Sequence, residues 1–238
     1  MVKSLEGITA RFISFWWGDN GFLSLLVLLL FSVFCAPVFD DILGQILISL
    51  FFSLLLLSGV YEVSSHIAPR ILAGMVAVTA IALRWLQNVF PSLELSYWLL
   101  SLSLVYFLLL TWVVLRRVYQ DGPVASKRLR WALVAYILLA ITWSYIYQLI
   151  ELRLPGSFII SAALLSQGEH SLQLNLTYFS FVTLTTLGYG DITPLHPTAR
   201  IFAIMEALLG QLYPATLLAR LVSLEIIGRH AKQVVIER

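Results

Sequence analysis

The sequence has 238 residues, of which 60% are hydrophobic and only 12% charged, and its mean hydropathy is +0.90. A soluble domain usually has about a quarter of its residues charged, so this composition excludes an ordinary soluble fold and predicts a surface that faces lipid. The net charge of +2 is too small to indicate nucleic acid binding, and the single cysteine, Cys35, excludes a disulfide framework or a cysteine metal site.

The first residues, 1–21, are less apolar than the sequence that follows. Their apolar side chains recur at rough helical spacing and include the pair Trp16-Trp17, which predicts a short helix in the membrane interface. An irregular lead-in is the alternative. The scattered charges and the lack of a small-residue cleavage site do not fit a signal peptide.

Six long apolar segments follow, each with the roughly 20 residues that a helix needs to cross the hydrocarbon core. They are residues 22–39, 42–61, 67–86, 95–115, 131–150 and 199–218. We therefore predict an all-α membrane protein with six transmembrane helices.

The distribution of Lys and Arg predicts the orientation of these helices. With a cytoplasmic amino terminus, the inside segments hold twelve Lys and Arg residues, and the outside segments hold only Arg84, Arg153 and Arg200. Both termini are therefore expected in the cytoplasm. The segment between the fifth and sixth spans should enter the membrane from outside.

A polar loop divides the chain into two parts. It contains Asp121-Gly122-Pro123, which is a turn signal, followed by a basic cluster. This cluster fits either a topology determinant at the membrane face or a binding site for lipid head groups. The predicted parts are a four-helix membrane domain at 22–118, a cytoplasmic linker at 119–130, a second membrane domain at 131–227 and a cytoplasmic tail at 228–238.

The segment between the fifth and sixth spans carries the most informative string, Thr-Leu-Thr-Thr-Leu-Gly-Tyr-Gly-Asp at residues 183–191. Residues 171–185 have a composition that is compatible with a helix, which at about 15 residues would cross only part of the bilayer. The carboxyl end of that helix would direct negative partial charge toward the glycine-rich string.

Backbone carbonyl oxygens can select a potassium ion by replacing its water shell, with threonine hydroxyls below them. Consecutive carbonyls of an ordinary strand point to alternate sides, so directing them all to one side requires backbone angles that glycine tolerates. Gly188 and Gly190 alternate with Leu187 and Tyr189, whose side chains can point away, and Thr186 would supply the hydroxyl. Because irregular backbone at membrane depth must be surrounded by protein or water, several chains must enclose the ion path.

These residues resemble the potassium channel family. The string TTLGYGD, followed by Pro194, is similar to the family signature TTVGYGD, and Arg200 and Gly210 stand ten and twenty residues after Gly190, as in simple bacterial members. The likeness is specific over about residues 131–224, which makes 131–227 a predicted pore domain. The first four spans resemble six-span channels only in topology.

The resemblance implies a homotetramer in the plasma (inner) membrane, surrounded by lipids, with K+ as the permeant ion. Neither an organic cofactor nor a nucleic acid partner is expected. The implied roles are ion binding in the selectivity filter by Thr186, Leu187, Gly188, Tyr189 and Gly190, filter support by Thr185 and Asp191, and a gating hinge at Gly210. Pro214 is also expected to kink the last span.

The sequence departs from the family pattern at several positions. Leu187 replaces the usual valine, Tyr178-Phe179 replace a tryptophan pair, and Val182 stands where some relatives have a carboxylate that braces the filter. Glu206 lies within the last span, where an acid is a functional candidate. We expect Glu206 to brace the filter or its helix from behind; a purely structural hydrogen bond is the alternative.

Two other functions are compatible with much of this pattern: a non-selective cation channel and a non-conducting sensor or regulatory subunit. The intact glycines and Tyr189 favour potassium selectivity. An enzyme is not expected, because the histidines have no metal-ligand spacing and no catalytic motif is present. The fourth span, 95–115, contains no Lys or Arg, which predicts that the channel is not steeply voltage-gated.

Overall fold

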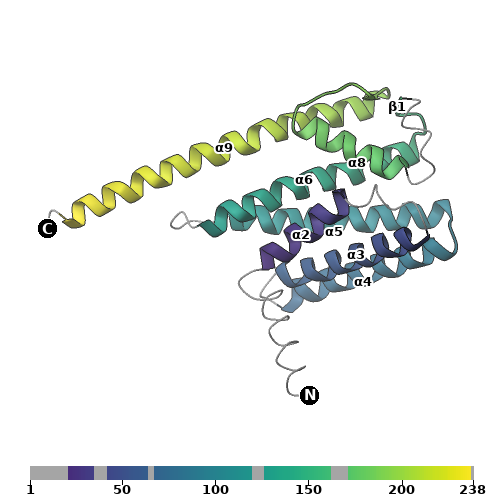
Figure 1. Cartoon of the computed structure of the whole chain (residues 1–238), viewed down its shortest axis with the longest axis horizontal. Coiled ribbons are helices and arrows are strands. Elements are labelled where there is room, and N and C mark those ends of the chain that lie inside the picture. Colours follow the sequence, from purple (N-terminus) through teal and green to yellow (C-terminus); the bar gives the residue numbers. More distant parts are fainter. Residues whose placement is uncertain (1–20, 35–41, 64–66, 120–125, 162–170, 237–238) are drawn as a thin grey trace, which may run out of the picture.

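The computed structural model describes residues 21–34, 42–63, 67–119, 126–161 and 171–236, and most of them are helical (Figure 1). The elements are α2 (Gly21–Phe34), α3 (Ile42–Val63), α4 (Ile67–Val89), α5 (Leu93–Tyr119), α6 (Ser126–Arg153), β1 (Phe158–Ile160), α8 (Ser171–Leu184), β2 (Ile192–Pro194) and α9 (Pro197–Ile236). The mostly helical architecture agrees with the all-α part of the predicted fold class. Residues 1–20 of the predicted interfacial segment lie outside the described residues.

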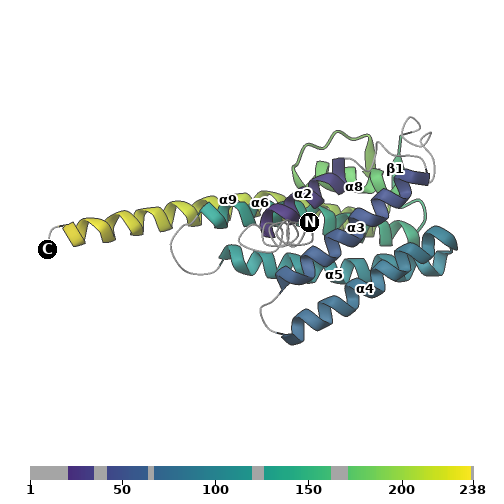
Figure 2. The same ribbon diagram turned by 60° about the horizontal axis from the view of Figure 1, so that its bottom comes forward.

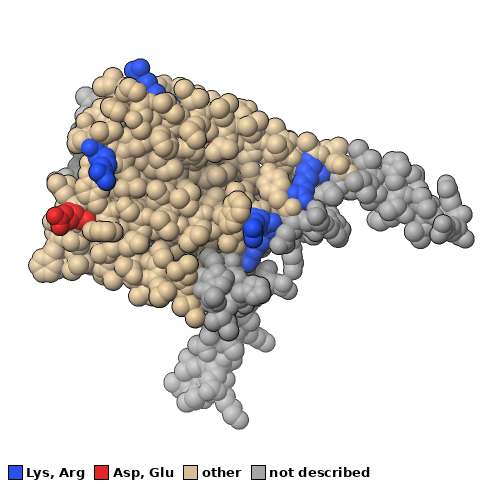
Figure 3. All heavy atoms as spheres, turned by 180° about the vertical axis from the view of Figure 1, so that it is seen from behind, with Lys and Arg blue, Asp and Glu red and all other residues tan. Residues whose placement is uncertain are grey.

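Four described helical segments are long and apolar enough to cross a membrane: Arg70–Val89, Leu93–Tyr119, Leu129–Arg153 and Pro197–Arg220. A shorter apolar stretch, Ile46–Val60, lies within α3. Figure 3 shows a face of the molecule on which the coloured charged residues lie toward the two ends of the helices, with a broad uncharged band between them. These features are those of a helical membrane protein, and the total of six spans stays a prediction.

Several helices extend beyond the apolar segments seen in the sequence. α5 continues to Tyr119, and α6 already begins at Ser126, inside the predicted linker. The physical reason is that basic and aromatic residues at the membrane surface continue a helix instead of ending it. Near these ends the Arg116 guanidinium lies 5.1 Å from the centre of the Trp112 ring, and that of Arg117 lies 5.0 Å from the Trp131 ring.

α6 connects the two parts of the structure. It packs against α5 and α2, and also against α8 and α9. Figure 1 places α8 and α9 on one side of α6 and the earlier helices on the other. We call α2, α3, α4 and α5 the front helices, and α6, α8 and α9 the rear helices.

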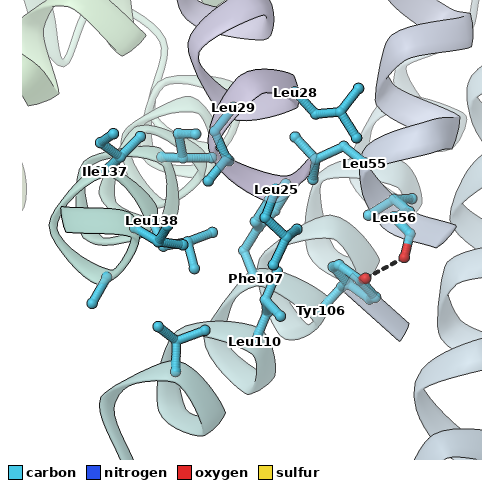
Figure 4. Packing of buried hydrophobic residues seen from close by; sticks show 14 of the residues in the cluster. Leu25, Leu28, Leu29, Leu55, Leu56, Tyr106, Phe107, Leu110, Ile137 and Leu138 are labelled. Atoms are coloured by element: carbon cyan, nitrogen blue, oxygen red, sulfur yellow. Dashed lines mark hydrogen bonds between the residues drawn. The ribbon is translucent and has the colours of Figure 1, made fainter. Parts of the chain in front are cut away.

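Apolar side chains fill the space between the front helices and α6. Figure 4 shows Leu25 and Leu29 of α2 directed toward Leu55, Phe107 and Leu138, which come from α3, α5 and α6. These side chains are almost fully buried. Within lipid there is no hydrophobic driving force between helices, because lipid tails are as apolar as leucine. Dense van der Waals packing of this kind therefore holds the helices together.

A short antiparallel sheet lies at one end of the rear helices. β1 pairs with β2, with Phe158 opposite Pro194 and Ile160 opposite Ile192. The sheet places the residues after the 183–191 string beside the residues that follow α6. Its three-residue strands are too short to have been predicted from alternation of apolar residues.

α9 continues beyond residue 227, where the second predicted membrane domain ends. It begins at Pro197, a favourable first helical residue, and its 40 residues correspond to about 60 Å of helix. Figures 1 and 2 show that its second half extends beyond the other helices. The helix continues through Pro214, and the kink expected there stays a prediction.

Candidate functional site

α8 positions the glycine-rich string. Its inner side packs against α6 and β1 through an aromatic cluster, in which the Phe179 ring centre lies 5.1 Å from that of Tyr147 and 5.3 Å from that of Phe158. Leu176 and Leu184 are also buried. The short helix is therefore anchored along its length, and its carboxyl end is held where the string begins.

α8 ends in a hydrogen-bonded cap. The Leu187 N–H donates to the Val182 carbonyl oxygen at 2.9 Å, and the Thr186 N–H donates to that of Thr183 at 3.0 Å. These two bonds, with a left-handed residue between them, form a Schellman motif. The left-handed residue is Thr186, with a φ of 59°, at a position where caps of this kind usually have glycine.

The sign of φ alternates beyond the cap. Gly188 has a φ of 60° and Gly190 a φ of 80°, whereas Leu187 and Tyr189 are not among the residues with positive φ. A Cβ added at either glycine would meet no atom of this chain within 4 Å. Glycine is therefore favoured at these positions by the backbone angle and not by a lack of space in the single chain.

The string lies on the surface of the single chain. The Leu187 side chain is 55% exposed and that of Tyr189 is 67% exposed. Both are large apolar or aromatic groups, which proteins usually cover when they lie in a contiguous group. Thr185, just before the cap, is also exposed, and its hydroxyl donates to the Phe181 carbonyl oxygen of its own helix at 2.6 Å.

Asp191 has a partner that the sequence reasoning missed. The Tyr178 hydroxyl donates to Asp191 Oδ2 at 2.7 Å. Tyr178 is one helical turn before Val182, so both residues lie on the same side of α8. Tyr178, which departs from the family's tryptophan pair, was the available signal for this bond.

Glu206 of α9 is fully buried between the rear helices. Its Oε2 accepts a hydrogen bond from the Tyr147 hydroxyl of α6, and its Oε1 lies within hydrogen-bond distance of the Ser180 hydroxyl of α8, both at 2.5 Å. The Ser180 hydroxyl also lies 2.7 Å from the Ala140 carbonyl oxygen and can donate to one acceptor at a time. The sequence indicated Glu206 but neither of its two side-chain partners.

α9 meets the end of α8 at Gly210. A Cβ added there would overlap the Leu184 carbonyl oxygen, so the missing side chain lets the two backbones touch. The Tyr136 hydroxyl donates to the same oxygen at 3.2 Å. One residue later, Gln211 Nε2 donates to the Thr186 hydroxyl oxygen at 2.9 Å, a contact that sequence reasoning did not find.

The α9 segment around Pro214 is held against α6. The Tyr213 hydroxyl donates to the Ala132 carbonyl oxygen at 2.9 Å, and the Tyr213 ring stacks on Tyr136 with 5.9 Å between ring centres. Of the predicted hinge residues, Gly210 thus touches α8, and Pro214 follows Tyr213, which contacts α6. Their role in gating stays a prediction.

Comparison with known proteins identifies relatives of the rear helices. Residues 135–225 match a protein family described as "Ion channel". Protein LctB of Bacillus caldotenax is 34% identical over 93 residues, which are 39% of this chain and 69% of that protein. Protein LctB of Geobacillus stearothermophilus is 33% identical over the same shares of the two chains.

A plant protein is also similar to part of this chain. Two pore potassium channel c of Oryza sativa subsp. japonica is 37% identical over 91 residues, or 38% of this chain. The chain spans only 17% of that relative's length. No solved structure matches the chain significantly.

Proposed function

This chain belongs to the potassium channel family, and on that premise we propose that it is one subunit of a potassium-selective pore. The pore would let K+ cross the membrane passively, down its electrochemical gradient. Membership of an ion channel family indicates a protein that conducts ions and not an enzyme.

The alternating backbone at residues 186–190 is the observation that carries this proposal. Positive φ at Thr186, Gly188 and Gly190, with other angles between them, can turn successive carbonyl oxygens toward the same side. A stack of such oxygens can replace the water around a potassium ion. α8 adds the negative end of its helix dipole just before this stack.

The residues proposed to coordinate K+ are those of the filter segment, defined here as residues 186–190. The Thr186 hydroxyl and the carbonyls of Thr186, Leu187, Gly188 and Tyr189 would form successive oxygen layers, and Gly190 would complete the strand. Asp191 and Thr185 would support its two ends. K+ is the transported ion, and the proposal includes no organic cofactor.

We propose a homotetramer, because one chain supplies one filter strand and four such strands can enclose a single line of ions. The exposed surface supports this assembly. Besides Leu187 and Tyr189, α9 has a series of exposed apolar side chains: Ile201, Ile204, Met205, Leu208, Leu209 and Leu212. Neighbouring subunits and lipid would cover these groups.

The proposed topology has six spans with both termini in the cytoplasm of a cell with a plasma (inner) membrane. α8 and the filter segment would enter from the outside. α5, the fourth front helix, contains no basic residue before Arg116 and Arg117 in its last turn. A steep voltage response needs three or four charges per subunit within the field, so we propose that gating is not steeply voltage-dependent.

Ion flux into liposomes that contain the purified full-length chain tests this proposal. With a K+ gradient the liposomes should show flux, and equimolar Na+ should give little. Equal Na+ and K+ flux would identify a non-selective cation channel. Absence of flux for both ions, with correctly inserted protein, would identify a non-conducting membrane protein.

A further inference from the structure

α9 contacts the filter segment through a side chain that has no assigned role. Gln211 Nε2 donates to the Thr186 hydroxyl oxygen at 2.9 Å, and the two residues are 25 positions apart in the chain. Gly210 beside it packs directly against the end of α8. The bond therefore depends on how α9 docks against α8 and not on local helix geometry.

The conformation of Thr186 indicates why this bond matters. Its φ of 59° is unusual for a β-branched residue, and a cap of this kind ordinarily uses glycine. Strained residues of this type cluster at functional sites. What threonine adds over glycine at this position is its side-chain hydroxyl, and Gln211 is the hydrogen-bond partner of that hydroxyl among the described residues.

We propose that Gln211 is a positioning residue for the innermost potassium site, an inference that rests on the proposed function. A threonine hydroxyl has one O–H donor and two acceptor lone pairs. The N–H of Gln211 occupies one lone pair and leaves the other for K+, while the O–H points in a third direction. The oxygen is thus oriented before the ion arrives, which lowers the cost of binding.

The bond also links the ion site to α9. Gln211 follows Gly210, whose backbone touches the Leu184 carbonyl oxygen two residues before Thr186. A shift of α9 at this contact would move the Gln211 carboxamide and release the hydroxyl. K+ affinity at the innermost site would then depend on the position of α9.

The test is a double-mutant cycle on the purified full-length protein. The thermal unfolding midpoint is measured while K+ replaces Na+ at constant ionic strength, which yields the K+ concentration for half-maximal stabilisation. The variants are Gln211→Met, Thr186→Val and the two combined. Gln173→Met, on the exposed side of α8, is the matched control because it makes the same change away from the filter segment.

We expect Gln211→Met to raise the half-maximal K+ concentration about three- to tenfold, the usual effect of losing one hydrogen bond. In the Thr186→Val background the same change should have less than a twofold effect, because the hydroxyl is already absent. Gln173→Met should leave the value unchanged. If Thr186→Val does not assemble, Thr186→Ser keeps the hydroxyl and must show the full effect of Gln211→Met.

The inference would be overturned if Gln211→Met changed the half-maximal K+ concentration equally with Thr186 and with Val at position 186. It would also be overturned if Gln211→Met alone left this concentration unchanged or lowered it. Flux assays on the same preparations separate the two proposals. Selective K+ flux without coupling between positions 186 and 211 would reject only the role of Gln211. Absence of both K+ flux and K+-dependent stabilisation in the unmodified protein would reject the proposed function and this inference together.

Discussion

The front and rear helices are both apolar, but they hold their polar groups in different ways. In the rear helices, Glu206 connects Tyr147 and Ser180 across three helices. In the front helices, polar bonds join pairs of helices: Asn88 Nδ2 of α4 donates to the Ser49 hydroxyl oxygen of α3 at 2.8 Å, and the Tyr106 hydroxyl of α5 donates to the Leu56 carbonyl oxygen of α3. A carboxylate that joins three helices constrains their relative positions more than a bond between two helices does. The match to the ion channel family covers the rear helices only.

The largest expected effect of a single substitution is at Gly188. Gly188→Ala should abolish K+-selective flux, because a side chain disfavours the φ of 60° in each of the four proposed strands. Gly74→Ala in front helix α4 is the control, since its added Cβ would only touch Val60 Cγ1 at 3.8 Å. Liposome flux should be lost in the first variant and kept in the second. Preserved K+ selectivity in Gly188→Ala would contradict the filter assignment.

A second pair of glycines compares the packing of the two regions directly. Gly210→Ala would push a Cβ into the Leu184 backbone carbonyl, whereas Gly59→Ala in α3 would push one into the hydroxyl end of the Tyr106 side chain. A side chain can rotate away but a backbone cannot. Gly210→Ala should therefore lower the stability more than Gly59→Ala does, within the range of about 1–3 kcal/mol that overpacking usually costs.

The measurement for this pair is the unfolding midpoint of both variants in the same detergent, followed by K+ flux. Gly210→Ala should lower the midpoint more and should reduce flux. A larger loss of stability in Gly59→Ala would show that the front helices are the more narrowly constrained region.

A smaller effect is expected at the buried carboxylate. Glu206→Gln places an amide NH2 where a carboxylate oxygen stood, so the Ser180 hydroxyl must turn to its other acceptor, the Ala140 carbonyl oxygen, at a cost of about 0.5–1.5 kcal/mol. Tyr147→Phe should reproduce part of this loss. Tyr106→Phe in the front helices removes the bond to the Leu56 carbonyl oxygen and is the control, with expected loss of stability but unchanged flux.

Unfolding midpoints and the time course of K+ flux measure these three variants. Reduced or unstable flux in Glu206→Gln, with normal flux in Tyr106→Phe, would support a filter brace. Unchanged flux in Glu206→Gln would favour the alternative of a purely structural hydrogen bond.

The smallest effect is expected at the cationic end of α5. Arg116→Gln and Arg117→Gln should leave the voltage dependence of the current unchanged, because both residues lie in the last turn of the helix beside tryptophan rings. Current–voltage curves in planar bilayers are the measurement. A clear loss of voltage sensitivity in either variant would give α5 a sensing role that its sequence does not predict.

The sequence by itself determined the membrane class, the order of the helices and the position of the glycine-rich string. Composition and the length of apolar segments suffice for the first two, since a helix needs a definite number of apolar residues to cross lipid. The string could be interpreted because its chemistry is local: glycine permits positive φ wherever it occurs, and Gly188 and Gly190 have it. Helix ends were less predictable, because basic and aromatic residues extend helices past the apolar core.

Only the tertiary structure decided which distant side chains meet. Glu206 was visible as a candidate, but its bonds to Tyr147 and Ser180 depend on how three helices dock. The same holds for the pairing of Tyr178 with Asp191 and of Gln211 with Thr186. Hydrogen bonds require atoms within a few tenths of an ångström of a set distance. Sequence spacing along separate helices cannot supply that precision, because the relative shift and rotation of the helices come from packing.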